Sequence, residues 1–258
     1  MRLTVLVENT TASEHLPCEH GLSLYIETGD HTLLFDTGAG GLFAENAEKL
    51  GIDLPQVDLA ILSHSHNDHT GGLAHFLQVN PTAPVYAHPQ IFGPYYNGAQ
   101  KFIGPDPALQ TNPRLVFVDT ETRIAPGITL HPGLPPRFPV ETWGLSRLEK
   151  GTFVPDDFRH EQYLLIREGE KTICISGCSH RGILNILDWF RPDILVGGFH
   201  FMKMDPESPA LTAAAEALAR YPTTYYTGHC TGQSQYTRLR HILADRLLPL
   251  STGTTIFL

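Results

Sequence analysis

Short apolar runs, many with β-branched residues, alternate along the chain with longer segments whose apolar residues recur at helical spacing. In the first part of the chain the apolar runs that predict strands lie at 3–7, 22–26, 32–35 and 57–62. Gly29-Asp30 favours a hairpin between the second and third of these strands. The segment at 42–50 predicts a helix that ends at Gly51.

A regular alternation of strands and helices follows residue 160. The predicted strands lie at 162–167, 172–176, 193–196, 224–227 and 254–258, and the predicted helices at 181–190, 209–221 and 234–247. Each half of the chain therefore shows strands followed by a polar loop and a helix. This order predicts an α/β protein built as a duplicated sandwich of sheets and helices.

The middle of the chain, at about 81–159, has a different character. It holds most of the 20 prolines among glycines and aromatic residues, with strand-like runs at 84–87, 115–118 and 128–130. Long Pro-rich excursions in compact domains are commonly lids or binding loops. We therefore predict one domain over 1–258, with a pocket-forming insertion at 81–159. A passive surface insertion is the alternative.

The composition of the 258-residue chain is typical of a globular protein, with 41% hydrophobic and 17% charged residues. A net charge of −9 argues against nucleic acid as a partner, because phosphate binding favours a basic surface. No apolar run approaches the ~18 residues of a membrane span, and no export signal is recognised. We expect a cytoplasmic protein with a small-molecule substrate and no membrane partner, with a homo-oligomer as an open alternative. The four cysteines lack a disulfide framework and are expected to be thiols.

The strongest chemical signal is the segment 63–72, which reads Ser-His-Ser-His-Asn-Asp-His-Thr-Gly-Gly. Three histidines and an aspartate follow a predicted strand directly, and α/β sheets place their sites at such strand ends. Imidazole and carboxylate groups suit Zn, Fe or Mn, and this spacing allows one loop to serve one or two ions. The alternative is a polar loop that is rich in histidine by chance. We predict His64, His66, Asp68 and His69 as metal ligands.

Three later loops also carry candidate ligands directly after strands. They contain Cys178 with His180, then His200, and then His229 beside Cys230. A single histidine is more often a satisfied polar group than a ligand, but three strand-end histidines beside a His-rich motif favour a site. We predict His229, His180 and Cys178 as ligands. His200 is predicted equally as a metal ligand or as a contact of the substrate or of a ligand. Asp36 is predicted as a carboxylate that braces the His-rich loop from behind.

Several motifs carry a resemblance to a known family. They are Glu8-Asn9, Glu19-His20-Gly21-Leu22, Leu34-Phe35-Asp36-Thr37-Gly38, the His-rich segment, Gly177-Cys178-Ser179-His180, Gly197-Gly198-Phe199-His200 and His229-Cys230-Thr231-Gly232. Together they resemble the metallo-β-lactamase superfamily, in the branch related to the dihydropterin/ribofuranosylaminobenzene 5'-phosphate synthases. The resemblance implies an αββα four-layer sandwich of the metallo-β-lactamase type, with one or two divalent metal ions.

The resemblance also implies how the ligands are grouped. It assigns His64, His66 and His229 to one ion, and Asp68 and His69 to a second. Cys178 stands where the superfamily usually has an aspartate, and a thiolate there favours Zn or Fe over Mn. The superfamily usually has a further histidine ligand before the position of Cys178. The segment 156–161 is the only candidate for that motif here, and His180 is the alternative ligand.

These observations predict a metal-dependent hydrolase that uses a metal-activated water on a small anionic or phosphorylated substrate. Zn is the first choice of metal, with Fe and Mn as alternatives. The predicted catalytic residues are Asp68, which orients or deprotonates the water, and His180 and His200 as proton donors. The predicted substrate-binding residues are His20, Arg181, Tyr95 and Tyr96. Alternative functions are a pterin-related synthase, an iron-dependent redox enzyme on the same scaffold, and a non-catalytic metal-pocket sensor.

Overall fold

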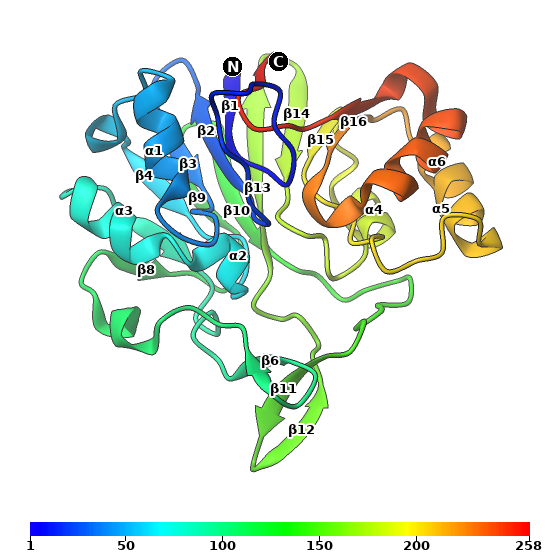
Figure 1. Cartoon of the computed structure of the whole chain (residues 1–258), viewed down its shortest axis with the longest axis horizontal. Helices are drawn as coiled ribbons and strands as arrows, with labels where there is room; N and C mark the ends of the chain where they lie inside the picture. The colour runs from blue at the N-terminus through cyan, green and yellow to red at the C-terminus, as the bar shows by residue number, and fades with distance from the viewer.

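Two seven-stranded sheets form the centre of the computed structural model, which describes residues 1–258 (Figure 1). The first sheet is antiparallel on one side of β3 and parallel on the other. Its strands, in spatial order, are β18 (Thr255–Phe257), β1 (Arg2–Val7), β2 (Ser23–Glu27), β3 (Thr32–Phe35), β4 (Leu59–Ile61), β5 (Val85–Ala87) and β8 (Leu115–Phe117).

The second sheet repeats this plan with the later part of the chain. It is antiparallel on one side of β14 and parallel on the other. Its strands, in spatial order, are β17 (Leu247–Pro249), β16 (Thr224–Thr227), β15 (Ile194–Val196), β14 (Lys171–Ile175), β13 (Gln162–Glu168), β10 (Ile128–Pro132) and β9 (Thr122–Ala125). The two sheets are therefore similar halves, as the alternation along the sequence predicts.

Helices cover the outer face of each sheet, on the left and on the right of Figure 1. The first sheet packs against α1 (Leu42–Lys49) and α3 (Leu73–Val79), and the second against α4 (Ile183–Phe190), α5 (Pro209–Ala219) and α6 (Gln233–Leu243). Short helical turns are α2 (Asn67–Thr70), η1 (Leu54–Gln56), η2 (Pro107–Thr111), η3 (His229–Thr231) and η4 (Ala244–Arg246). None of the helices is both long and apolar enough to span a membrane.

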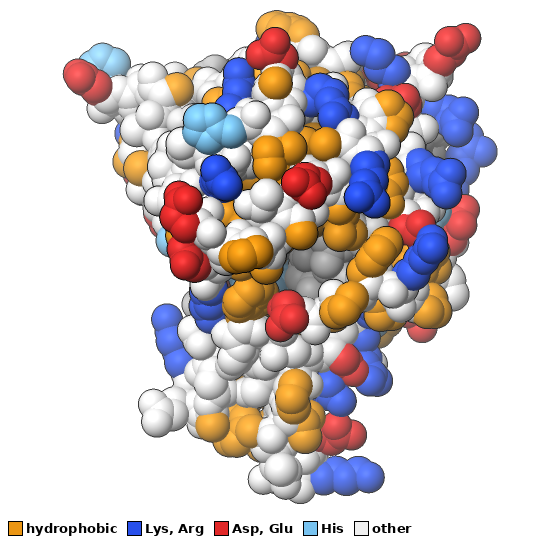
Figure 2. Space-filling model, turned by 90° about the vertical axis from the view of Figure 1, so that its right-hand side faces the viewer, with side chains coloured by type: hydrophobic (Ala, Val, Ile, Leu, Met, Phe, Trp, Pro, Cys, Tyr) orange, Lys and Arg blue, Asp and Glu red, His pale blue; other side chains and the backbone are white.

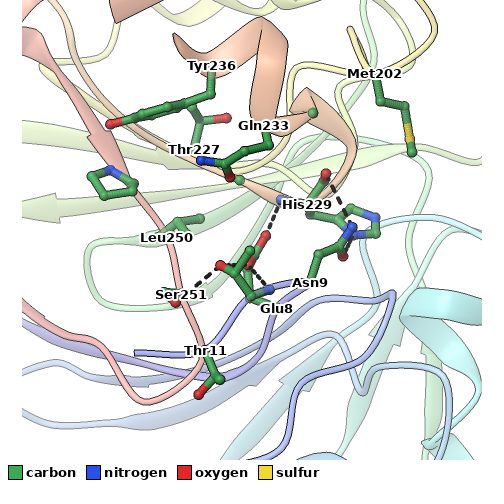
Figure 3. Close-up of a pocket in the computed structure, with 14 residues that line it drawn as sticks. Glu8, Asn9, Thr11, Met202, Thr227, His229, Gln233, Tyr236, Leu250 and Ser251 are labelled. Carbon is green, nitrogen blue, oxygen red and sulfur yellow. Dashed lines mark hydrogen bonds between the residues drawn. The ribbon is translucent and has the colours of Figure 1, made fainter. Parts of the chain in front are cut away.

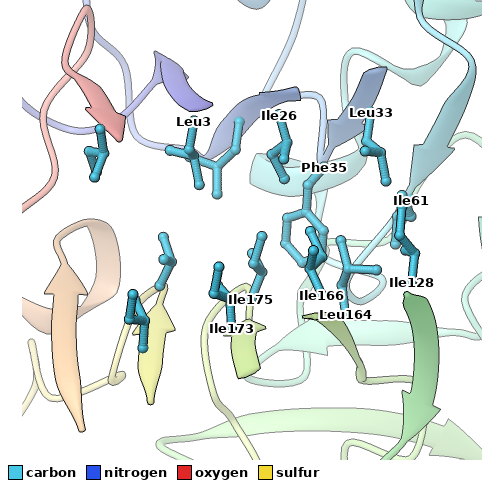
Figure 4. Close-up of a cluster of buried hydrophobic side chains, with 14 of the residues drawn as sticks. Leu3, Ile26, Leu33, Phe35, Ile61, Ile128, Leu164, Ile166, Ile173 and Ile175 are labelled. Atoms are coloured by element: carbon cyan, nitrogen blue, oxygen red, sulfur yellow. The ribbon is translucent and has the colours of Figure 1, made fainter. Parts of the chain in front are cut away.

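The largest hydrophobic cluster lies between the two sheets (Figure 4). Ile26 and Phe35 of the first sheet face Ile166 and Ile175 of the second, and all four are buried. Two further clusters fill the space between each sheet and its helices. Strands buried on both faces explain why the sequence shows nearly continuous apolar runs instead of strict alternation. The predicted αββα sandwich is confirmed.

A small third sheet projects from the sandwich at the bottom of Figure 1. Its strands are β12 (Thr152–Pro155), β11 (Leu145–Glu149), β6 (Tyr95–Asn97) and β7 (Lys101–Phe102). The Pro-rich stretch at 81–159 thus supplies this sheet in two parts, β6 with β7 and β11 with β12. It also supplies four strands of the sandwich: β5 comes before the first part, and β8, β9 and β10 come between the two parts. The apolar runs at 84–87, 115–118 and 128–130 are long enough to pair with the main sheets.

Three local differences from the predicted elements have clear causes. The last helix ends at Leu243 instead of 247, because Ala244 has a left-handed φ of 49°, and the chain then forms β17. Helix α4 begins at Ile183 instead of 181, after Gly182 with φ 90°. The His-rich loop itself contains α2. All four cysteines are free thiols, as expected.

Candidate metal centre

The predicted ligands converge because they follow parallel strands at the same edge of the sandwich. The His-rich segment follows β4 of the first sheet, while Cys178, His200 and His229 come after β14, β15 and β16 of the second. Gly177 allows the two halves to meet, since a Cβ there would collide with Ser63 Oγ and lie 2.9 Å from His64 Nδ1. A side chain at position 177 would therefore force the two ligand loops apart.

A first group of donors consists of His64, His66 and His180. Their ring centroids are 4.6–4.9 Å apart, and Cys178 Sγ lies within 4.8 Å of the donor nitrogens of His64 and His180. Nε2 of His64 and His66 and both ring nitrogens of His180 are buried without a hydrogen-bond partner. Each such atom costs about 1–3 kcal/mol when it is left unpaired. Four orphaned nitrogens in one place fit a metal ion.

Burial also sets the protonation of this group. It lowers the pKa of His66 to about 3, and the pKa values of His64 and His180 well below their ordinary value. The three imidazoles are therefore neutral near pH 7, as metal ligands must be.

A second group consists of Asp68, His69 and His229. The two Nε2 atoms of His69 and His229 are 3.1 Å apart, and Asp68 Oδ2 lies 3.3 Å from His229 Nε2 and 3.8 Å from His69 Nε2. Burial opposes ionisation of Asp68, but His69, His20 and His229 hold its pKa well below the ordinary value. The Asp68 and Asp36 carboxylates outweigh burial and raise the pKa of His69 to about 9. The same negative field would favour a metal cation at this point.

Cys178 lies between the two groups. Its Sγ is 3.2 Å from His69 Nε2 and close to donor atoms of both groups, and its side chain is buried. The structure therefore groups the histidines differently from the resemblance. His180 joins His64 and His66, whereas His229 faces His69 and Asp68. The loop with His180 follows β14, and the loop with His229 follows β16, which lies two strands further along the sheet.

Hydrogen bonds behind the ligands orient their rings. Asp36 accepts from Ser63 and from Nδ1 of His69 at 2.7 Å, and Ser63 Oγ lies 2.8 Å from His64 Nδ1. Because Ser63 Oγ donates to Asp36, it accepts from His64 Nδ1, which leaves Nε2 of the neutral His64 unprotonated. His69 Nδ1 donates to Asp36, so its Nε2 faces Cys178 and His229. Asp36 thus lies where the sequence predicts a brace.

The corresponding support for His229 comes from the N-terminal segment (Figure 3). Nδ1 of His229 donates to Asn9 Oδ1 at 2.8 Å, and its backbone N–H donates to the buried carboxylate of Glu8. Sequence reasoning assigned no role to these two residues, although Glu8-Asn9 directly follows the first strand. A polar pair at a strand end is the signal that could have identified them.

The segment 156–161 lies behind the first group. His160 donates from Nε2 to Asp156 at 3.1 Å and accepts from the Ser65 backbone N–H at Nδ1, so both of its ring nitrogens are engaged. Glu161 is buried, which raises its pKa, and it accepts from the backbone N–H groups of His180 and Arg181. These side chains hold the ligand loops in position.

A cavity of about 270 Å³ opens over the ligands. Five of the predicted ligands and His200 line it, together with His20, Asn97, Lys101, Met202 and Lys203; His64 and His69 lie outside its lining. His20 Nε2 lies 3.3 Å from Asp68 Oδ2, and the His20 side chain is half-exposed. His200, with φ 56°, has both ring nitrogens unpartnered and its ring centroid 4.2 Å from that of His180.

The other three predicted substrate-binding residues do not line this cavity. The Arg181 guanidinium donates to Leu134 O and lies over Trp189. Tyr95 is buried against His160, with ring centroids 4.1 Å apart, and Tyr96 packs against Phe102 and Phe153. Successive side chains of β6 point to opposite faces, so these tyrosines have no common target. Asn97 and Lys101 of the same small sheet line the cavity instead.

The sequence matches a known protein family. Residues 16–229 match the family model of the Metallo-beta-lactamase superfamily. The chain belongs to this superfamily. It is 31% identical over 244 residues to 7,8-dihydropterin-6-methyl-4-(beta-D-ribofuranosyl)-aminobenzene-5'-phosphate synthase of Methanocaldococcus jannaschii, with 83% of this chain and 81% of that protein covered.

Solved structures of the superfamily share the fold. Tm1679, described as a metal-dependent hydrolase of the beta-lactamase superfamily, superposes with a TM-score of 0.86 at 29% identity, covering 100% of this chain and 99% of that one. The metallo-beta-lactamase fold protein YhfI from Bacillus subtilis has a TM-score of 0.61 at 14% identity, covering 99% and 98% of the two chains. At 14% identity, the similarity to YhfI supports a shared fold and nothing more.

Proposed function

We propose that this superfamily member is a metal-dependent hydrolase of a small anionic, phosphorylated substrate. The observation that carries the proposal is the pair of donor groups that Cys178 joins beneath an open cavity. His64, His66 and His180 would hold one ion, and Asp68, His69 and His229 a second, with Cys178 between them. Imidazole and thiolate donors favour Zn or Fe over Mn. When bound, such ions polarise the substrate and lower the pKa of a water molecule.

The chain's own residues supply the proton chemistry in this proposal. Asp68 stays ionised at neutral pH, so its main role is to accept a hydrogen bond and orient the attacking water. His20, half-exposed and in contact with Asp68, connects that carboxylate with solvent. His200 lines the cavity with unpartnered ring nitrogens and is placed to donate a proton to the leaving group. His180 belongs to the ligand set instead.

The anionic part of the substrate is assigned to the mouth of the cavity. Lys101 and Lys203 are the basic residues that line it, and Nζ of Lys203 already donates to Trp143 O at 2.7 Å. Lys101 lies on the exposed β7 strand of the third sheet. Its ammonium group would attract a phosphate at the entrance.

A second candidate activity follows from the similarity to the M. jannaschii synthase. At 31% identity the chain shares most of that protein's length, so a synthase reaction that joins two substrates at the same centre is the alternative. An iron-dependent redox reaction is a further alternative, suggested by Cys178. Metal analysis with a visible spectrum separates it from a zinc hydrolase, because Zn is colourless and ferric thiolate is not.

The test is hydrolysis of p-nitrophenyl phosphate and bis(p-nitrophenyl) phosphate by metal-replete protein. We expect turnover that is lost on chelation, restored by Zn or Fe, and abolished in His66→Ala. His75→Ala is the matched control, because His75 is an exposed histidine of α3 outside the site. Metal-independent hydrolysis, or full activity and metal content in His66→Ala, would contradict the proposal. Absence of turnover on both esters by fully metallated protein would favour the synthase.

A further inference from the structure

A second cavity, of about 480 Å³, adjoins the candidate metal centre. It shares His180 and His200 with the cavity over the ligands, so the two spaces meet at these imidazoles. Its walls come from α4, α5 and the loops at 138–143 and 199–204. Figure 2 views the molecule from the side of α4, α5 and α6 and shows a hollow rimmed by hydrophobic side chains.

The lining of this cavity differs sharply from that of the first. Phe138, Trp143, Phe201 and Met204 supply large apolar surfaces, and no lysine or arginine lines the space. Glu141 is its only acidic residue. Ring-lined cavities of this size, with few polar groups, typically bind flat apolar parts of small molecules. A phosphate would find no cationic partner here.

Hydrogen bonds hold the wall in place. The side-chain amide of the buried Asn185 in α4 makes three hydrogen bonds to residues 137–138 and one to the segment just before its own helix. Its Oδ1 accepts from the backbone N–H groups of Arg137 and Phe138 at 2.9 and 2.7 Å, and its Nδ2 donates to the carbonyls of Phe138 and Arg181 at 3.0 and 2.7 Å. At the other end of the 138–143 loop, Nζ of Lys203 in the 199–204 loop donates a hydrogen bond to Trp143 O. The cavity is therefore preformed.

Backbone conformation gives an independent indication of function. Three non-glycine residues that line this cavity have left-handed φ angles: Trp143 at 54°, Ser179 at 56° and His200 at 56°. Such angles are uncommon, and for a bulky residue such as tryptophan they are true outliers. Strained residues that the surrounding structure holds in place cluster at ligand sites.

We propose that this cavity binds an uncharged aromatic group of the substrate, with the reacting bond placed at the shared imidazoles. The proposal rests on the proposed function and deepens it. The aromatic group lies against Trp143 and Phe201 of this cavity, and the anionic group lies toward Lys101, which lines the cavity over the ligands. The substrate class is thus a phosphorylated molecule that carries a planar apolar ring system.

The cavity can be tested without knowing the substrate, by titrating the full-length protein with 1-naphthylmethanol and following binding by ligand-observed NMR. Ala214→Phe on α5 fills the space, and Ala213→Phe is the matched control, an exposed neighbour on the same helix that does not line it. We expect Ala214→Phe to weaken binding by about tenfold or more, and Ala213→Phe to change it by less than about twofold. Ala210→Phe, also in the lining, is a second filling variant if the first is unstable.

The outcomes separate this inference from the proposed function. Naphthyl binding should persist in the chelator-treated His66→Ala variant, so its loss in Ala214→Phe alone supports the cavity whatever the metal does. Equal affinity in the wild type and in both filling variants would overturn the inference. Tighter binding of 1-hexanol than of 1-naphthylmethanol would overturn the aromatic assignment, because a planar ring should fit between flat walls better than a flexible chain.

Discussion

The two halves of the sandwich repeat the same strand plan but contribute to the metal centre in different ways. The first half supplies His64, His66, Asp68 and His69 from one loop after β4. The second half supplies its donors from two loops, with Cys178 and His180 after β14 and His229 after β16. Candidate ligands can therefore come from one short segment, as in the first half, or from separate loops that the order of the strands brings together, as in the second half. The candidate metal centre uses ligands of both origins.

The difference decides which residues act together. Neighbours along the first half separate in space, because the His66 ring packs against His64 and His180, whereas the His69 ring faces His229. Residues far apart in the sequence come together, because His180 faces His64 and His66, and His229 faces His69. Each proposed ion thus draws on both halves, and Cys178 links them.

The largest expected effect is the loss of one metal ion when a histidine of either donor group is replaced. His66→Ala and His180→Ala should each remove the same ion and leave the other, whereas His229→Ala should spare that ion and remove the second. Because a catalytic metal supplies several kcal/mol, each variant should lose on the order of 10³-fold in turnover. Elemental analysis, with circular dichroism as a check of folding, measures the stoichiometry. If His66→Ala and His229→Ala proved to lose the same ion, the grouping implied by the family resemblance would be restored.

A smaller effect is expected from the braces behind the ligands, one in each half. Asp36→Asn removes the charged acceptor of His69, and Asn9→Ala removes the acceptor of His229. Loss of such partners typically weakens metal binding by about 10- to 100-fold. We expect Asp36→Asn to be the more harmful, because Asp36 also holds Ser63 behind His64. Competition with a chromophoric chelator measures both affinities, and wild-type affinity in both variants would show that the braces are passive.

That these candidate ligands lie close together could largely be predicted from the sequence, for a physical reason that the two halves illustrate. The spacing from His64 to His69 is local, so the chain itself holds these side chains together. Strand-end positions also identified Cys178, His180 and His229 as candidates. Their grouping could not be predicted, because it depends on which parallel strand lies next to which and on how the two sheets face each other.

The substrate-facing residues were harder to predict than the ligands. Lys101 and Asn97 belong to a third sheet whose strands are two to five residues long, too short for a clear periodic pattern. Tyr95 and Tyr96 attracted attention as aromatic residues among prolines, yet neither side chain reaches the cavity. The walls of the aromatic cavity are positioned by Asn185, whose hydrogen bonds to a loop 47 and 48 residues away leave no trace in the local sequence.

The central claim is that two ions lie at two donor groups shared between the halves of the fold. Anomalous diffraction at the metal edge, from crystals of the metal-replete protein, tests it most directly. We predict two peaks, one among His64, His66 and His180 and the other among Asp68, His69 and His229, with the sulfur of Cys178 beside both. A single peak bound by His64, His66 and His229, or peaks away from Cys178, would contradict the account.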